Sequence, residues 1–343
     1  MLRALLSLPA SALRALSGGV GVTMGGRTLD PRFQLLASRA RGQPPLANLP
    51  PQAVRVGSAS SLALMSGRPE KGVEIEALSV PGGIGPTAAR VYLPADRDPA
   101  SPVMVWGHFG GGVIGDLETC HAFCTILAKE AHCPVLSIAY RLAPEHRFPA
   151  GLEDMLLAYR WAREHAERFG SPAGRAAVGG DSMGGNFAAV VAQEMRRAGD
   201  RQPEVQLLIY PALDLAASGG SMATYAKAWP LSAETMAWFM THYLREEDSP
   251  TDDPRLSPLR AASLEGLAPA VIATAGFDPL LDQGESYARR LREAGVSVSH
   301  HCYDHLPHAF TAFTGVSPEA DLACREIARL TRNALSFAAA ATA

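Results

Sequence analysis

Short apolar runs alternate with longer stretches of helical periodicity along most of the chain. The apolar runs predict eight β-strands, at 73–80, 88–93, 102–106, 134–139, 176–178, 205–210, 270–275 and 296–302. From the third strand on, the intervening stretches predict helices at 117–131, 151–169, 183–198, 281–294 and 318–337. Strands that alternate with helices indicate an α/β fold, in which helices cover both faces of a mostly parallel sheet. The first two strands are joined by the short segment 81–86, which predicts a hairpin and therefore an antiparallel edge.

The N-terminal part of the chain does not follow this alternation. Residues 1–70 predict helices separated by Pro- and Gly-rich breaks. Residues 1–16 superficially resemble a secretory signal, but Pro9 and Arg14 interrupt the apolar run and no clean cleavage site follows. We expect instead an amphipathic helix with Ser7 as its N-cap and Pro9 in its first turn.

A second interruption lies between Pro211 and Pro269. This long segment carries one predicted helix, at 233–244, and four aromatic residues, Trp229, Trp238, Phe239 and Tyr243. An aromatic-rich helical insertion at the carboxyl edge of a parallel sheet is typical of a lid over a site. For any single aromatic residue, packing in a second layer of core is an equally good interpretation.

The composition limits the classes of protein that need to be considered. The 343 residues are 47% hydrophobic and 19% charged, which indicates a large folded core in one or two domains and argues against disorder. A net charge of −3 gives no electrostatic reason to expect nucleic acid or an anionic membrane as a partner. No apolar run is long enough to span a bilayer. Five cysteines, an odd number, do not indicate a disulfide framework and favour a reducing compartment such as the cytoplasm.

The first candidate for chemistry is a Gly-x-Ser-x-Gly motif, with Ser182 between Gly180 and Gly184. A predicted strand precedes it and a predicted helix follows it, which is the context of a nucleophile elbow. In such a turn the serine hydroxyl is held above the sheet, and the helix N-terminus favours negative charge beside it. Because the motif also occurs by chance, a base and an acid must be found elsewhere in the chain.

The acid should follow the serine and precede the histidine if the order is that of the α/β-hydrolases. Asp278 comes just after the strand predicted at 270–275, at the sheet edge that also presents Ser182. The pair Asp278-Pro279 is an equally good start of a helix, with Asp278 as the N-cap. Asp282 is the rival candidate, but it falls inside the next predicted helix.

Candidates for the base come from four histidines, His300, His301, His305 and His308. The first two should lie within the last strand and point to opposite faces. The other two are expected in the loop before the final helix, where a triad base belongs. A metal site made by these histidines and Cys302 is a weaker interpretation, because strand alternation separates the ligands and the spacing does not fit zinc.

Stabilisation of an oxyanion requires free backbone N–H groups beside the nucleophile. The segment 106–116, Trp-Gly-His-Phe-Gly-Gly-Gly-Val-Ile-Gly-Asp, follows the third predicted strand and is rich in glycine. Its position after that strand, rather than its glycine content, makes it the candidate oxyanion loop.

With these motifs, residues from about 75 to 335 resemble the hormone-sensitive-lipase-like (bacterial family IV) esterases of the α/β-hydrolase fold. The elbow Gly-Asp-Ser-Met-Gly-Gly-Asn is one of the segments that carry the resemblance. The others are Tyr-Arg-Leu-Ala-Pro-Glu-His-Arg-Phe-Pro-Ala at 140–150, Leu-Ile-Tyr-Pro-Ala-Leu-Asp at 208–214, Ser-Pro-Leu at 257–259, Asp-Pro-Leu at 278–280 and Tyr-Asp-His-Leu-Pro-His-Ala-Phe at 303–310. The last segment is similar to the family's catalytic-histidine loop, and this similarity selects His308 over His305.

The resemblance implies an α/β-hydrolase with Ser182 as nucleophile, His308 as general base and Asp278 as the residue that orients it. It also implies an eight-stranded catalytic domain over 71–343 and a helical cap. The cap would combine helices of residues 1–70 with an insertion at about 215–255. No metal and no cofactor are expected, and the substrates should be esters with small or medium acyl groups.

The oxyanion loop departs from the family pattern, His-Gly-Gly-Gly followed by an aromatic residue. Phe109 replaces the first glycine and Gly112 replaces the aromatic residue, while the later spacing is kept. The expected donors are therefore the N–H groups of Gly110, Gly111 and Met183, and Gly112 should tolerate a large side chain. If the loop is shifted by one residue, Gly111 and Gly112 would be the donors instead.

Phe109, Gly112 and Asp181 are the further residues expected to lie beside the substrate. The sequence thus predicts a cytoplasmic serine carboxylesterase that acts on small-molecule esters, with a homodimer as a candidate assembly. Two alternatives use the same residues. One is an amidase or arylacetamide-type deacetylase, and the other is a ligand-binding relative that has lost catalysis.

Overall fold

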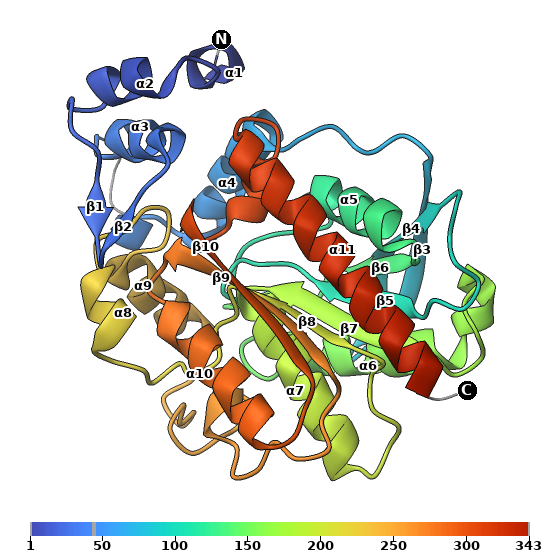
Figure 1. Cartoon of the computed structure of the whole chain (residues 1–343). Helices are drawn as coiled ribbons and strands as arrows, with labels where there is room; N and C mark the ends of the chain where they lie inside the picture. The colour runs from blue at the N-terminus through green and yellow to red at the C-terminus, as the bar shows by residue number, and fades with distance from the viewer. Residues whose placement is uncertain (1, 43–45, 342–343) are drawn as a thin grey trace.

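The computed structural model of the chain describes residues 2–42 and 46–341. Its centre is an eight-stranded sheet in the order β10-β9-β8-β7-β5-β6-β4-β3 (Figure 1). The strands are β3 (Val73–Gly82), β4 (Gly85–Pro94), β5 (Val103–Gly107), β6 (Val135–Ile138), β7 (Ala176–Asp181), β8 (Gln206–Ile209), β9 (Ala270–Phe277) and β10 (Val298–Pro307). Each of the eight predicted strands is confirmed.

The pairing of the strands also agrees with the prediction. The six strands from β5 to β10, which form the body of the sheet, run parallel to one another. The hairpin of β3 and β4 pairs antiparallel, and β4 also runs antiparallel to β6. The α/β fold with an antiparallel edge is therefore confirmed.

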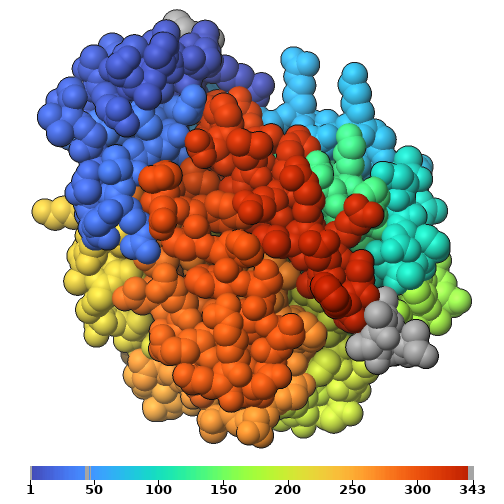
Figure 2. Space-filling view, viewed as in Figure 1, coloured from blue at the N-terminus to red at the C-terminus, as the bar shows by residue number. Residues whose placement is uncertain are grey.

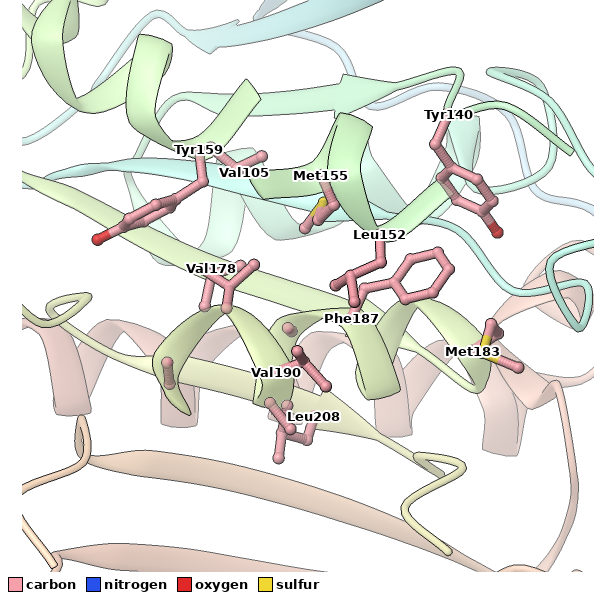
Figure 3. Close-up of a cluster of buried hydrophobic side chains, with 14 of the residues drawn as sticks. Val105, Tyr140, Leu152, Met155, Tyr159, Val178, Met183, Phe187, Val190 and Leu208 are labelled. Carbon is pink, nitrogen blue, oxygen red and sulfur yellow. The ribbon is translucent and has the colours of Figure 1, made fainter. Parts of the chain in front are cut away.

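Helices cover both faces of the sheet, because each strand presents alternate side chains to opposite sides. In β5, Val103 and Val105 belong to one buried cluster, whereas Met104 and Trp106 belong to the other. The first face is covered by α6 (Ala150–Glu164), α7 (Met183–Arg197) and α10 (Leu281–Glu293), and the second by α5 (His121–Ala131) and α11 (Pro318–Ala341). Figure 3 shows Val105 and Val178 of the sheet among side chains of α6 and α7.

One helix begins later than its periodicity predicts. The segment 117–131 was expected to be helical throughout, but α5 starts only at His121. Asp116 accepts hydrogen bonds from the backbone N–H groups of Glu118 and Thr119, and Thr119 Oγ1 accepts one from the N–H of Asp116. These local bonds hold residues 116–119 in turns and compete with the first turn of the helix.

The N-terminal segment forms one end of the molecule (Figures 1 and 2). It contains α1 (Leu2–Leu6), α2 (Ala10–Leu16), α3 (Pro31–Ala40), α4 (Pro51–Met65) and the small hairpin of β1 (Thr23–Met24) and β2 (Arg27–Thr28). The helix that was expected to begin after Ser7 is present as α2, but it starts at Ala10, so Pro9 is at its N-cap position and not in its first turn. Ser7 does not cap a helix; its hydroxyl donates to the carbonyl of Ala4.

The segment between Pro211 and Pro269 lies near the same end of the molecule. It carries α8 (Gly220–Thr224) and α9 (Ala233–Tyr243), and α9 matches the predicted helix to within one residue. Trp238 of α9 donates from its indole N–H to the carbonyl of Leu49, so the insertion contacts the N-terminal segment. None of the described helices has both the length and the apolar character needed to cross a bilayer.

Candidate active site

The turn between β7 and α7 places Ser182 at the carboxyl edge of the sheet. Ser182 has a φ of 55°, a backbone conformation that is strained for a residue with a side chain. Crowding explains the glycines on either side of it. A Cβ on Gly180 would lie 2.2 Å from the carbonyl carbon of Gly184, and one on Gly184 would lie 2.0 Å from the carbonyl oxygen of Gly107. Only glycine allows the turn to pack this closely.

Three side chains from distant parts of the chain meet at this turn. His308 Nε2 lies 2.9 Å from Ser182 Oγ, and His308 Nδ1 lies 2.7 Å from Asp278 Oδ2. Asp278 is fully buried, and the side chains of Ser182 and His308 are nearly so. With Asp278 as a carboxylate, Nδ1 donates to it and Nε2 is left to accept the serine proton. The structure therefore brings together the three residues that the sequence singles out.

Asp278 uses both of its carboxylate oxygens, one of them in the turn that precedes α10. Oδ1 accepts a hydrogen bond of 2.8 Å from the backbone N–H of Leu280. The other, Oδ2, receives His308. The interpretation of Asp278 as the N-cap is wrong, because α10 begins only at Leu281 and Leu280 is at the N-cap position. Asp282 has a different role, because its carboxylate accepts from the N–H of Ser221 and holds α8.

The other three histidines lie away from Ser182. β10 extends to Pro307, so His305 is in this strand and not in the predicted loop. Its Nδ1 bonds to the carbonyl of Thr28 at 2.8 Å, and the side chain is exposed. His300 bonds through Nε2 to Thr274 Oγ1 at 3.1 Å. Within residues 2–42 and 46–341, His, Cys, Asp and Glu side chains form no group of three or more that could hold a metal ion.

The glycine-rich loop after β5 lies beside Ser182 and adopts backbone angles that favour glycine. Gly110, Gly111 and Gly112 have φ values of 127°, 61° and 71°. The carbonyl of Gly110 accepts from the N–H groups of Val113 and Ile114, both at 3.0 Å, which folds the loop tightly. Gly110, Gly111 and Met183 all line the same cavity as Ser182, whereas Gly112 does not.

The three further residues expected at the substrate have different positions. Phe109 lines the cavity. Gly112 faces Tyr243 of α9, and a Cβ there would lie 2.6 Å from Cε2 of the ring, so this position cannot accept a large side chain without a shift of α9. Asp181 is fully buried and does not line the cavity, because its carboxylate turns into the core beneath Ser182.

The carboxylate of Asp181 is bound by two hydroxyl groups and a thiol. Tyr210 and Thr311 donate to Oδ2 at 2.8 and 2.9 Å, and the thiol of Cys120 lies 3.4 Å from Oδ1. Burial raises the pKa of Asp181 to about 6, although these hydrogen bonds oppose the shift. Sequence reasoning missed this network. The one feature of the sequence that points to this network is that Tyr210 lies in the segment 208–214, which resembles the family.

His108, the first residue of the loop motif, is also buried and acts within the loop. Its Nδ1 bonds to the carbonyl of Phe109 at 2.7 Å, and its ring stacks on Tyr140 at a centroid distance of 4.2 Å. Burial lowers the pKa of His108 to about 4, so the ring is neutral at physiological pH. We infer that His108 stabilises the loop and takes no part in proton transfer.

A second residue that the sequence did not reveal is Arg55 of α4. Its guanidinium donates to the carbonyls of Val113 and Ala143, at 2.8 and 2.7 Å, and pairs with Glu145 at 2.7 Å. Arg55 thereby ties the N-terminal segment to the loop that carries Gly110 and Gly111. Nothing in the local pattern around Arg55 indicates these contacts, because its partners lie 58 to 90 residues away.

A cavity of about 800 Å³ opens above Ser182 and is mainly apolar. Its walls come from three parts of the chain. The N-terminal segment contributes Leu36, Leu62 and Met65; the insertion contributes Leu231, Met236 and Phe239; and the residues after His308 contribute Ala312 and Phe313. An apolar cavity with a few convergent polar groups is the usual form of a small-molecule site.

Several known proteins are similar to this chain in sequence and in structure. A family model described as the alpha/beta hydrolase fold matches residues 104–312. The carboxylic ester hydrolase LipN of Mycobacterium tuberculosis is 45% identical over 311 residues, which covers 88% of this chain and 82% of LipN. The ethyl acetate hydrolase of Pseudomonas putida is 38% identical over 269 residues, covering 76% of this chain and 83% of that protein.

Among solved structures, an ester hydrolase from the metagenome of Lake Arreo superimposes with a TM-score of 0.84 at 39% identity, covering 88% of this chain and 96% of that one. An esterase from the archaeon Pyrobaculum calidifontis superimposes with a TM-score of 0.79 at 37% identity, with the same coverage. The chain therefore belongs to the α/β-hydrolase fold family, in its hormone-sensitive-lipase-like group of carboxylic ester hydrolases.

Proposed function

We propose that this protein is a serine carboxylesterase that hydrolyses short- to medium-chain acyl esters of small molecules through an acyl-enzyme. The observation that carries the proposal is the hydrogen-bonded series Ser182, His308 and Asp278 on the wall of an apolar cavity. The relatives named above as ester hydrolases support the same class of reaction.

In the proposed mechanism, His308 Nε2 accepts the proton of Ser182 as Oγ attacks the ester carbonyl. The carbonyl oxygen then carries a negative charge, and the N–H groups of Gly110, Gly111 and Met183 would stabilise it. That Gly110 and Gly111 line the cavity, and Gly112 does not, supports this register of the loop over the shifted one. Asp278 stabilises the imidazolium, which next protonates the departing alcohol.

The second half of the reaction reverses these roles. A water molecule loses its proton to His308 and attacks the acyl-enzyme, and the same backbone donors stabilise the second oxyanion. Ser182 then recovers its proton and the acid is released. The mechanism uses side chains and backbone groups alone.

The domain organisation belongs to the same proposal. Residues 1–70 and the insertion at about 215–255 would form a cap over a catalytic domain of residues 71–343. Lining of one cavity by Leu62, Met65, Met236 and Phe239 supports this division. We place the enzyme in the cytoplasm, on the strength of its odd number of cysteines.

A fluorophosphonate probe, which reacts with activated serines, tests the nucleophile. We expect the wild-type protein to be labelled stoichiometrically at Ser182, and Ser182→Ala to be unlabelled and to lose several orders of magnitude in kcat. Since the alanine keeps the backbone of the turn, its thermal midpoint should match that of the wild type. An Asp282→Asn variant, changed at the rival carboxylate, should still be labelled. Labelling elsewhere, or a Ser182→Ala variant within tenfold of wild-type kcat, would contradict the proposal.

A series of linear p-nitrophenyl esters tests the substrate class. Each methylene buried in the cavity should stabilise the transition state by ~0.8 kcal/mol, or about fourfold in kcat/KM, until the cavity is full. We expect kcat/KM to rise and then fall at short to medium acyl length. A kcat/KM that keeps rising with acyl length, up to emulsified long-chain triglycerides, would argue against an esterase of this kind.

A further inference from the structure

Two polar side chains, Asp214 and Gln283, line the cavity beside a group of apolar residues. The apolar residues, which cluster together, are Leu215, Met222, Met236, Phe239 and Leu280. We call the part of the cavity lined by these seven residues the Gln283 branch. Neither polar side chain belongs to the proposed catalytic series.

The orientation of the Gln283 amide follows from its partners. Its Oε1 accepts from the backbone N–H groups of Leu213 and Asp214, at 2.8 and 2.9 Å. Since a backbone N–H can only donate, the oxygen must be on that side and Nε2 must be on the other. Among the residues that the structure describes, Nε2 then meets only the sulfur of Met222, at 3.9 Å. A thioether is a weak acceptor, so the amide group of a side chain that is 96% buried is left with unsatisfied N–H donors.

Asp214 presents the complementary group. Its Oδ1 accepts from the N–H of Ala216 at 3.0 Å and from Arg260 Nε at 2.8 Å. In the part of the chain that the structure describes, no hydrogen bond reaches Oδ2. Because Gln283 binds the backbone of Asp214 itself, the two side chains are anchored to the same short segment. A donor that meets only a thioether and an acceptor that no described donor reaches therefore belong to two neighbouring residues that line the same cavity.

We propose that the Gln283 branch recognises a hydroxyl group of the substrate. The hydroxyl oxygen would accept from Gln283 Nε2, and its proton would be donated to Asp214 Oδ2. A hydroxyl can satisfy both groups at once, whereas an ether or ketone can satisfy only Gln283 and a methyl group satisfies neither. The inference rests on the proposed ester hydrolysis and narrows it to esters that carry a hydroxyl on an aliphatic arm.

Such a hydroxyl can belong to either half of the ester, and two series of substrates distinguish them. In the first, ethyl esters of ω-hydroxy acids with three to six carbons are compared with esters in which a methyl or methoxy group replaces the hydroxyl. In the second, monoacetates of linear diols are compared with alkyl and methoxyalkyl acetates of matching length. Release of acid in a pH-stat gives kcat/KM for each substrate. We expect a preference for hydroxyl over methyl of about tenfold or more, at one arm length and in one series.

Two isosteric variants test the assignment of donor and acceptor. Asp214→Asn keeps an oxygen for Ala216 and Arg260 but places an NH2 group where Oδ2 was, so both groups become donors. This variant should shift the preference from hydroxyl towards methoxy. Gln283→Glu keeps the acceptor for the two backbone N–H groups but removes the donor. In this variant kcat/KM should fall most for the methoxy substrates. Ser61→Ala removes a hydroxyl from the α4 wall of the same cavity. This variant should keep the wild-type ratios of kcat/KM between hydroxyl, methoxy and methyl substrates.

The readout is the ratio of kcat/KM values between substrates within each variant. A merely structural role of Asp214 or Gln283 would lower kcat/KM for all substrates together. Ratios that stay at wild-type values in Asp214→Asn and Gln283→Glu would overturn the inference. So would a wild-type enzyme that hydrolyses methyl-terminated esters without any advantage for hydroxyl in either series, although ester hydrolysis itself would then stand. A protein with no turnover and no labelling of Ser182 would overturn the proposed function, and this inference with it.

Discussion

The ring of Tyr243 occupies the space that a side chain on Gly112 would need, since a Cβ there would lie 2.6 Å from Cε2 of the ring. Related loops are expected to carry an aromatic residue at this position. Here an aromatic ring comes instead from α9, more than a hundred residues further along the chain. The departure of the loop from the family pattern is thus matched by a residue of the insertion.

Substitution of Gly112 should therefore damage the enzyme. A side chain in the left-handed region costs about 1–2 kcal/mol, and the contact with Tyr243 adds to this. We expect Gly112→Ala to lower kcat and the thermal midpoint, and Gly112→Trp to remove nearly all activity on a short-chain ester. This reverses the expectation from the sequence that a large residue would be tolerated. A Gly112→Trp enzyme within tenfold of wild-type kcat would mean that α9 moves aside easily.

Arg55 allows a test of whether the N-terminal segment positions the loop. Arg55→Met removes two charge-assisted hydrogen bonds, one to the carbonyl of Val113 in the loop and one to that of Ala143, each worth about 1.5–3 kcal/mol. We expect kcat to fall about tenfold or more, with a smaller change in KM, in steady-state kinetics on one short-chain ester. Glu145→Gln is the matched control, because it weakens the ion pair and leaves both carbonyl contacts. If the two variants behave alike, the carbonyl contacts do not matter for catalysis.

Asp181 should make the stability of the protein depend on pH. The pKa of Asp181 rises on folding from an ordinary value of 3.8 to about 6, so the folded state binds the proton more tightly than the unfolded state. Asp181 therefore does not lower the free energy of unfolding below pH 3.8. As the pH rises from there through 6, the free energy of unfolding falls by about 3 kcal/mol. Asp181→Asn cannot lose a proton and should not show this loss.

Urea unfolding of both proteins between pH 4 and pH 7.5 measures the effect. The difference in free energy of unfolding, wild type minus Asp181→Asn, should fall by about 2.4 kcal/mol over this range, because part of the loss has already occurred at pH 4. Other titrating groups cancel in the difference because both proteins share them. A difference that is constant with pH would show that Asp181 is not the source.

His308 and His305 form a natural pair of test and control. His308→Ala removes the group within 2.9 Å of Ser182 Oγ and should reduce kcat by several orders of magnitude. His305→Ala loses only an exposed contact with the carbonyl of Thr28 and should keep kcat within a few-fold of the wild type. The reverse pattern would mean that the wrong histidine was assigned as the base.

The strands, and the residues Ser182, Asp278 and His308, could be predicted from the sequence because the patterns that indicate them are local. β7, for example, is buried at every position, and its apolar run has a glycine turn directly after it. The order serine, aspartate, histidine could likewise be read along the chain. Asp278 shows the limit of such reasoning. The sequence predicted either an N-cap or an orienting carboxylate, whereas one oxygen of Asp278 holds the turn before α10 and the other receives His308.

What the sequence did not reveal depends on contacts between distant segments. Thr311 reaches Asp181 across 130 residues, and Arg55 reaches Ala143 across 88. β1 and β2 have two residues each, too few for an alternating pattern to be recognised. The placement of Asp181 was missed for a related reason. Strand alternation gives two possible directions for its side chain, and only the packing of Tyr210 and Thr311 decides between them.

The carboxylate of Asp278 has a consequence for how the enzyme would fail on heating. The same side chain holds the turn that leads into α10 and the ring of His308, so opening of that turn would release the imidazole while the sheet is still intact. Loss of activity should then occur some degrees below the cooperative melting of the protein. Because only this turn would be open at that stage, activity lost in this way should return as soon as the sample is cooled.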